Sequence, residues 1–215
     1  MQENRRGFLS HCALIAFLGI ELSMPGEVSA NGIFSKPGSF CRAKTLTQEN
    51  ASLGSSKWDR DHFRYHIARR DDYDLSSEVW DGEFRLAFDS WSEVVPLTFE
   101  QVRANEDFDL YITTGKRRRE GFGKSGGTLA WAQLPPSRKY NGVLMSKFDL
   151  AERWVLPSNS EQGIVLRSVA THEIGHLLGL GHSTEKDAIM YPYINNSLKP
   201  MADDINQIQS LYGKK

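Results

Sequence analysis

The stretch HEIGHLLGLGH, residues 172–182, contains three of the six histidines of the chain. His172 and His176 are four residues apart, which on an α-helix places both side chains on one face, about 6 Å apart along the axis. Two imidazole nitrogens on one face can bind the same metal ion, and the usual zinc distance to each is about 2.0–2.1 Å. The spacing therefore predicts a pair of zinc ligands on a helix.

His182 can be a third ligand only if the helix ends before it. On a continuing helix it would lie about 9 Å beyond His176 and point in another direction. Gly179 stands between them, and a glycine after the last helical turn readily adopts the left-handed conformation that reverses the chain. We therefore expect a turn at Gly179 and a third imidazole from the returning loop. Three imidazoles leave the fourth tetrahedral position open, as in catalytic zinc sites.

Glu173 lies about 100° around the helix from His172, so it flanks the ion without binding it. Its carboxylate can accept a proton from a water molecule on the zinc, which lowers the pKa of that water to about 7. The activated water attacks a carbonyl polarised by the ion, and Glu173 passes the proton to the leaving amine. The predicted chemistry is metal-assisted amide hydrolysis. The alternative is an ordinary helix that ends at a glycine. In that case the five fixed positions of the pattern would be a coincidence, which is expected in about one chain in 10⁴ to 10⁵.

The elements that must position these residues follow from hydrophobic periodicity. Helices are expected over about 76–94, 164–178 and 203–212. The first has an N-cap at Ser76 or Ser77 and one apolar face formed by Trp80, Phe84, Ala87, Phe88 and Trp91. Strands are expected within 62–67, 96–102, 108–113, 121–134 and 141–148. The mixed order predicts a single α/β (α+β) domain.

The first thirty residues are expected to be a cleaved signal peptide. Arg5 and Arg6 precede the apolar run CALIAFLGI, and VSA ends at Ala30 with the small residues that signal peptidase reads. The run is shorter than the roughly 20 residues that span a membrane, although an uncleaved N-terminal anchor is an alternative. We therefore expect a secreted protein without a membrane span, extracellular or, from a Gram-negative bacterium, periplasmic. NAS at Asn50 and NNS at Asn195 fit the N-glycosylation pattern, which matters in a eukaryotic host.

Residues 31–56 are rich in Gly, Ser, Asn and Lys and show no sustained periodicity, which predicts a short extended leader or pro-segment without a packed element. The catalytic domain is then expected over 57–215. Signal cleavage removes Cys12 and leaves Cys41 alone, so an intramolecular disulfide is excluded. The net charge of −1 gives no reason to expect nucleic acid as a partner. The expected partner of this monomer is a protein or peptide substrate.

The chain resembles a known family in several stretches. HEIGHLLGLGH followed by AIMYP is similar to the metzincin pattern with its Met-turn, which implies that Met190 packs beneath the zinc without binding it. AFDSWSEVVPLTF, GGTLAWA, DDINQIQSLYG and Ser183 after the third histidine narrow the resemblance to the matrixins, or matrix metalloproteinases, over about residues 57–213. The resemblance implies a twisted, mostly parallel five-stranded sheet with three helices, and a secreted zinc endopeptidase of extracellular matrix and other extracellular proteins.

The resemblance also implies how substrate is held. In the family the strand after Gly-Gly pairs with extended substrate, so Leu129 and Ala130 would offer backbone hydrogen bonds. Ser168 would line a pocket beside the zinc together with a wall formed by Pro192, Tyr193 and Ile194. Because Ser168 is small, we expect a deep pocket for a large apolar side chain.

The family resemblance also implies a second, structural zinc ion and calcium, and we assess both from the residues at the matching positions. The structural zinc is expected to be absent, because Lys116 and Arg117–Arg119 stand where ligands would lie and repel a cation, while Trp131 and Lys147 replace two histidines. Calcium stays open. Its candidate ligands are Asp149 and Glu152, which match one family pair, and Asp109, which matches another ligand, whereas Gly123 replaces an expected aspartate. The alternative is that these acids are solvated loop charges.

Cys41 has two interpretations. Family zymogens block the open zinc position with a leader cysteine, and Cys41 lies at a similar spacing upstream of Lys57. A thiolate is a good fourth zinc ligand and would exclude the water. However, the flanks GSFCRAK lack the family's Pro-Arg-Cys-Gly-x-Pro-Asp context, and the leader is too short for a folded prodomain. A thiol latch in a zymogen and an inert or intermolecular cysteine both remain open.

The leading interpretation is an active secreted zinc endopeptidase. One alternative is a matrixin-like module that binds peptides but turns over poorly, and the intact histidines, Glu173 and Met190 argue against it. The other is a protease of narrow specificity that acts on a single partner, which the residues do not distinguish from a broad enzyme.

Overall fold

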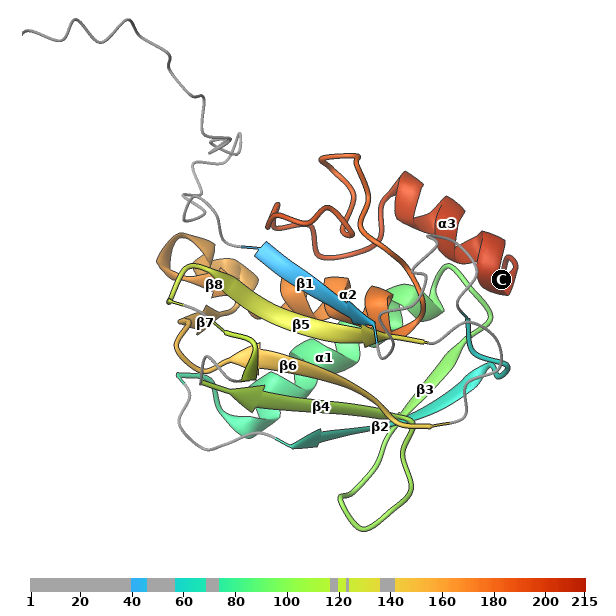
Figure 1. Cartoon of the computed structure of the whole chain (residues 1–215), viewed down its shortest axis with the longest axis horizontal. Coiled ribbons are helices and arrows are strands. Elements are labelled where there is room, and N and C mark those ends of the chain that lie inside the picture. The colour runs from blue at the N-terminus through green and yellow to red at the C-terminus, as the bar shows by residue number, and fades with distance from the viewer. Residues whose placement is uncertain (1–39, 46–56, 69–73, 117–119, 123, 136–141) are drawn as a thin grey trace, which may run out of the picture.

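The computed structural model describes residues 40–45, 57–68, 74–116, 120–122, 124–135 and 142–215. Its main sheet has six strands in the order β1-β5-β6-β4-β2-β3 (Figure 1). These are β1 (Phe40–Thr45), β2 (His62–Ala68), β3 (Thr98–Gln101), β4 (Leu110–Gly115), β5 (Thr128–Leu134) and β6 (Leu144–Asp149). Helices α1 (Ser77–Ser92) and α2 (Leu166–Leu177) lie side by side behind the sheet, and α3 (Ala202–Tyr212) ends near the C-terminus of α2. The predicted signal peptide lies outside the described residues.

Strand directions agree with the sequence-based expectation. β2, β3, β4 and β6 are parallel, and β5 runs antiparallel to β6. These five strands and three helices confirm the predicted α/β domain. β1 adds a sixth strand from the leader, parallel to β5. The expectation that the leader has no packed element is therefore wrong for residues 40–45, because an open sheet edge offers unpaired backbone groups to an extended segment.

The hydrophobic core lies between the sheet and the helices α1 and α2. The predicted apolar face of α1 is buried, and Phe88 stacks on Tyr65 of β2 with ring centroids 4.2 Å apart. Phe84 meets Phe148 of β6 edge-on at 5.1 Å. The hydroxyl of Ser76 accepts the backbone N–H of Val79 at 3.4 Å, so Ser76 is the N-cap. One face of α1 thus fixes the helix against the central strands.

Two side chains of α1 hold the neighbouring helix α2. The indole N–H of Trp91 donates to the carbonyl of Thr171 at 3.0 Å. The guanidinium of Arg167 donates from Nε and Nη2 to the two carboxylate oxygens of Glu83, at 2.9 and 2.8 Å. A bidentate pair of this kind fixes orientation as well as distance. The helix that carries the first two histidines is therefore fixed against its neighbour.

The C-terminal end of α2 is held by residues from both ends of the predicted catalytic domain. The indole N–H of Trp58 donates to the carbonyl of Leu177 at 2.7 Å. The hydroxyl of Tyr212 donates to the carbonyl of Leu178 at 2.7 Å and accepts the backbone N–H of Trp58 at 3.2 Å. Burial raises the pKa of Tyr212 to about 12, which keeps the hydroxyl a donor. These bonds satisfy carbonyls that a helix end leaves without an internal partner.

The start of α2 differs slightly from the expectation. The helix begins at Leu166 because the two preceding residues, β8 (Ile164–Val165), pair with β7 (Trp154–Val155) on either side of the 3₁₀ helix η2 (Pro157–Gln162). Of the helices in the described ranges, none is both long enough and apolar enough to cross a membrane.

Candidate metal centre

A tight turn ends α2 and redirects the chain toward the helix. Gly179 has a φ of +107°, in the left-handed region that favours glycine. Its N–H donates to the carbonyl of His176 at 2.9 Å, and the N–H of Leu180 donates to the carbonyl of Gly175 at 2.9 Å. This pair of bonds is the Schellman arrangement. The expected turn at Gly179 is present, and it returns the loop that carries His182.

The turn brings the three histidines of the motif together. The Nε2 atoms of His172 and His176 are 3.0 Å apart, and those of His176 and His182 are 3.2 Å apart. The candidate ligand atoms of all three lie within 4.8 Å of one another. In a tetrahedral zinc site with ordinary bond lengths, two ligand nitrogens are about 3.4 Å apart. The spacing of the three nitrogens fits one such ion.

Backbone carbonyls set the tautomers of the two buried rings. Nδ1 of His172 lies 2.6 Å from the carbonyl oxygen of Ile189, and Nδ1 of His176 lies 2.8 Å from that of Leu180. A carbonyl only accepts, so each Nδ1 carries the hydrogen and each Nε2 presents a lone pair. Lone pairs 3.0 Å apart repel one another unless a cation lies between them. The donor set therefore fits a zinc ion.

Burial keeps these imidazoles neutral. It lowers the pKa of His172 to about 3, and the backbone bond to Ile189 only partly opposes this effect. Burial also lowers the pKa of His176, and the nearby His172 and His182 lower it further. The pKa of His182 is likewise lowered by burial. Neutral imidazole is the form that binds metal, so the ligands are ready at physiological pH. Glu173, on α2 between the first two histidines, is fully buried.

The sulfur of Met190 packs against Gly175 of α2, and two residues missed from the sequence make this arrangement possible. A Cβ atom at Gly175 would overlap the sulfur of Met190 and lie 3.0 Å from Cζ2 of Trp91, so only glycine fits there. The carboxylate of Asp204 on α3 accepts the N–H groups of Ile189, Met190 and Met201 at 2.7, 3.0 and 2.8 Å. Burial raises the pKa of Asp204, although these three bonds oppose the shift. The signal for Asp204 was an acidic residue on the apolar face of a helix.

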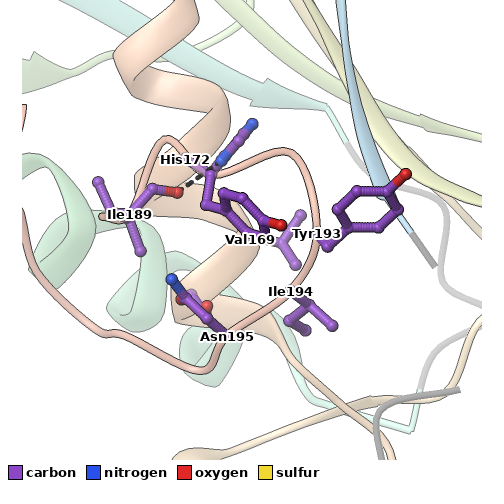
Figure 2. A pocket seen from close by; sticks show the side chains of 8 residues that line it. Val169, His172, Ile189, Tyr193, Ile194 and Asn195 are labelled. Carbon is purple, nitrogen blue, oxygen red and sulfur yellow. Dashed lines mark hydrogen bonds between the residues drawn. The ribbon is translucent and has the colours of Figure 1, made fainter. Parts of the chain in front are cut away.

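Figure 2 shows a small pocket beside His172, with a cavity volume of about 10 Å³. Its lining consists of Ser168, Val169, His172, Ile189, Tyr191, Tyr193, Ile194 and Asn195. Of the residues that the resemblance assigns to substrate, Ser168, Tyr193 and Ile194 line this pocket and Pro192 does not. The side chain of Tyr193 is 44% exposed and remains available to a ligand. Asn195 was not predicted as a lining residue.

The sheet edge expected to hold substrate is paired with the leader. Leu129 and Ala130 belong to β5, and Cys41 of β1 is the register partner of Ala130. β1 is parallel to β5 along residues 40–45. An extended peptide that adds to this edge of β5 therefore competes with β1 for the same backbone groups.

The three acidic calcium candidates do not form one cluster. Asp149 is 1% exposed, its Oδ1 accepts the N–H of Ala151 at 2.8 Å, and its Oδ2 has no hydrogen-bond partner among the described residues. Burial raises the pKa of Asp149. Glu152 nearby accepts the N–H of Gly126 and the hydroxyl of Ser125. Asp109 directly precedes the first residue of β4, whereas Asp149 is paired with the last residue of that strand. Asp109 is bound by the side chain of Arg60 and the backbone of Arg64, so it does not join the other two acids.

The residues where the resemblance would place a structural zinc interact with one another. Nζ of Lys147 lies 3.5 Å from Oε1 of Glu120 and 5.8 Å from the ring centroid of Trp131. The indole N–H of Trp131 donates to the carbonyl of Glu120 at 2.8 Å, and Oε2 of Glu120 accepts the N–H of Lys116 at 3.0 Å. An ammonium group stands among these residues, so they do not fit a second zinc ion.

Comparisons with known proteins agree with the geometry of the site. The matrixin family model matches residues 57–213. Metalloendoproteinase 1-MMP of Arabidopsis thaliana is 41% identical over 171 residues, which cover 74% of this chain and 45% of that protein. Stromelysin-1 of Equus caballus is 34% identical over 205 residues, which cover 92% of this chain and 41% of that protein.

Matrix metalloproteinase-26 of Homo sapiens is 37% identical over 182 residues, covering 81% of this chain and 67% of that protein. The chain spans less than half the length of the first two relatives. The resemblance inferred from the sequence is nevertheless confirmed over the whole span that carries the three histidines, the Met-turn and α3. The chain therefore belongs to the matrixin family.

Proposed function

We propose that this chain is a secreted zinc-dependent endopeptidase that hydrolyses peptide bonds of extracellular proteins. The observation that carries the proposal is the convergence of three neutral imidazoles within 4.8 Å, next to a buried carboxylate. Several matrixin relatives are named as metalloproteinases, which supports the same class of reaction. The signal peptide predicted over residues 1–30 supports secretion.

The proposed zinc ligands are Nε2 of His172, His176 and His182. When bound, zinc polarises the substrate carbonyl and lowers the pKa of a water molecule to about 7. The carbonyls of Ile189 and Leu180 keep two of the rings in the tautomer that binds metal. Met190 and Asp204 keep the loop that carries the first of these carbonyls against α2.

The proposed general base is Glu173. Its carboxylate accepts the proton of the attacking water and then donates that proton to the leaving amine. Two features support this role: its place on α2 next to His172, and its complete burial, which strengthens electrostatic interactions in the site. General acid–base catalysis by a positioned side chain contributes about 10²–10⁴-fold to the rate.

Substrate is proposed to bind between β5 and the pocket. An extended peptide would pair with the backbone of Leu129 and Ala130, and one side chain would enter the pocket lined by Ser168 and Ile194. The cavity of about 10 Å³ has room for about one water molecule, so in this proposal the lining residues move apart to admit a large side chain.

The leader is proposed to act as a latch. β1 lies on the strand that substrate would use, and Cys41 is the register partner of Ala130 within it. In this proposal the thiolate of Cys41 is the fourth zinc ligand of the unactivated form. Activity should appear in Cys41→Ser or after treatment with a thiol-modifying reagent. An inert cysteine would leave activity unchanged in both experiments.

The metal content is proposed to be one zinc ion, with calcium at Asp149 and Glu152. The buried, unsatisfied Oδ2 of Asp149 supports a calcium ion, since a buried carboxylate oxygen needs a partner. Asp109 is not included, because Arg60 already neutralises it. Added calcium should raise the melting temperature of the protein but not that of Asp149→Asn, and equal shifts in both would exclude this site.

The function is tested by incubating the purified Cys41→Ser protein, in which a latch cannot mask activity, with denatured protein and with a quenched peptide library. Chelator should abolish cleavage and added zinc should restore it. Glu173→Ala should retain the metal but lose at least about 10²-fold in kcat. Cleavage that survives chelation, or that is unchanged in Glu173→Ala, would refute the mechanism.

A further inference from the structure

Asn195 makes an unusually complete set of contacts for a loop side chain. Its Nδ2 donates to the carbonyls of Lys186 and Ala188, at 3.0 and 2.7 Å. Its Oδ1 accepts the N–H of Ser197 at 3.1 Å. The amide orientation is fixed by chemistry, because the two carbonyls need a donor and the N–H needs an acceptor. Both hydrogens of the amide nitrogen are therefore in use.

These bonds connect the two sides of the pocket. Asn195 lies on the returning loop with Tyr193 and Ile194, and Figure 2 shows it at the pocket beside Ile189. Ala188, which accepts the shorter bond, directly precedes Ile189, whose carbonyl orients His172. The wall that faces a bound side chain is thus fastened next to the residue that holds a candidate ligand.

The local backbone supports the same role. The bond from Ser197 N–H to Oδ1 is an Asx-turn, which bends the chain directly after Asn195. Asn196 has a φ of +58°, a left-handed conformation that asparagine tolerates better than most residues. The loop therefore reverses at this point and presents Asn195 to the 186–188 segment.

We propose that Asn195 is a positioning residue that fixes the pocket wall, and that it does so only as an unmodified amide. This inference rests on the proposed function, because the pocket is taken to receive a substrate side chain. Asn195-Asn196-Ser197 is also an N-glycosylation sequence, and a glycan would be attached at Nδ2. Attachment replaces one N–H, so a glycosylated Asn195 could no longer donate to both carbonyls.

The kinetic test compares two peptides that carry leucine or alanine directly after the cleaved bond. All proteins carry Cys41→Ser, so that a latch does not mask activity. Asn195→Asp places a carboxylate oxygen against two carbonyl oxygens and should raise KM for the leucine peptide about tenfold, with kcat and the alanine peptide changed less than about twofold. Ser197→Ala removes the glycosylation sequence and keeps the Asn195 amide. It loses only the exposed 3.3 Å bond from Ser197 Oγ to the carbonyl of Asp187, so its KM for the leucine peptide should stay within about twofold of the parent. An equal KM in Asn195→Asp and parent for the leucine peptide would overturn the proposal.

The modification test uses protein secreted by a glycosylating host. Mass spectrometry of the active, zinc-loaded fraction should find Asn195 unmodified, and a glycan there in fully active protein would overturn the proposal. If the parent cleaves no peptide, the proposed function fails, and the side-chain amide signal of Asn195 in ¹⁵N NMR decides this inference independently. Slow hydrogen exchange of that amide supports the bonds to Lys186 and Ala188, and exchange as fast as in an exposed asparagine contradicts them.

Discussion

The three-histidine centre and the Lys147–Glu120–Trp131 cluster differ in how a positive charge is supplied to each. At the centre, neutral nitrogens converge with their lone pairs facing one another, an arrangement that a cation stabilises. In the cluster, the ammonium of Lys147 already stands between a carboxylate and an indole ring. The same domain thus has one place that fits a metal and one where a side chain supplies the positive charge.

The two regions also differ in burial, which sets the size of every expected effect. At the histidine centre, His172 and His176 are 3% and 0% exposed and their orienting bonds are buried, whereas His182 on the returning loop is exposed. The ion pair of the cluster is partly exposed, with 17% and 21% of the two side chains accessible. Substitutions at the centre should therefore lower stability strongly, by an amount that depends on chelator. Substitutions in the cluster should lower stability only slightly, and chelator should not alter the effect.

The largest effect is expected for Asp204→Asn. An amide in this place turns an NH₂ group toward backbone donors, and each buried N–H left without an acceptor costs about 1–3 kcal/mol. We expect a loss of about 3 kcal/mol in the free energy of unfolding, measured by urea denaturation, together with weaker zinc binding. Asp203→Asn, one residue earlier and partly exposed, is the matched control and should lose much less. Equal losses would show that Asp204 has no special role.

Gly175→Ala should be the next most disruptive change. The new methyl group overlaps the sulfur of Met190, and overpacking of a core costs about 1–3 kcal/mol. The melting temperature should fall and zinc affinity with it, because Met190 and α2 must move apart. Gly82→Ala on α1, where a Cβ meets nothing closer than 4.0 Å, is the control and should not destabilise. A Gly175→Ala protein as stable as the parent would contradict this packing.

The stability of the metal-free protein should depend on pH through His172. Its pKa is about 3 in the folded protein and about 6.5 in the unfolded chain, so between these values the unfolded chain binds more protons. The free energy of unfolding should therefore fall as pH drops from about 6.5 toward 3, by up to about 1.4 kcal/mol per pH unit for this residue. Urea denaturation in chelator measures the slope. His172→Leu should reduce it, and an unchanged slope would assign the pH dependence to other groups.

The smallest effect is expected in the Lys147 cluster. Lys147→Met and Glu120→Gln should each lower the free energy of unfolding by about 0.2–1 kcal/mol, the range of partly exposed ion pairs. The double variant should lose less than the sum of the two, and chelator should not change any of these values. Zinc content should remain at one ion per chain in all of them. Binding of a second ion to the parent protein would overturn the contrast between the two regions.

Local spacing explains which features were predictable from the sequence. His172, His176 and Gly179 lie within eight positions, and helix geometry alone relates them. The apolar face of α1 follows from the same 3.6-residue period. The turn at Gly179 and the apolar face of α1 agree with the structure to the residue.

Features that depend on contacts between distant segments were missed. The pairing of β1 with β5 joins residues about ninety positions apart, and nothing within residues 40–45 specifies it. Asp204 stands out in the sequence only as an acid on an apolar helix face, and Asn195 only as part of a glycosylation sequence. Their roles arise from backbone groups brought near them by the fold. Asp109 was a candidate calcium ligand through the family resemblance, and its ion pair with Arg60, which is 49 positions away, was not visible in the sequence.

X-ray absorption at the zinc edge of the Cys41→Ser protein tests the central claim most directly. The account predicts one zinc per chain with three imidazole nitrogens and one oxygen at about 2.0–2.1 Å. His182→Ala should lose a nitrogen from this shell or lose the metal, whereas His62→Ala, at an exposed residue of β2, should leave the spectrum unchanged. A zinc shell that His182→Ala does not alter, or one with four protein ligands in the Cys41→Ser protein, would contradict a catalytic centre built from these three histidines.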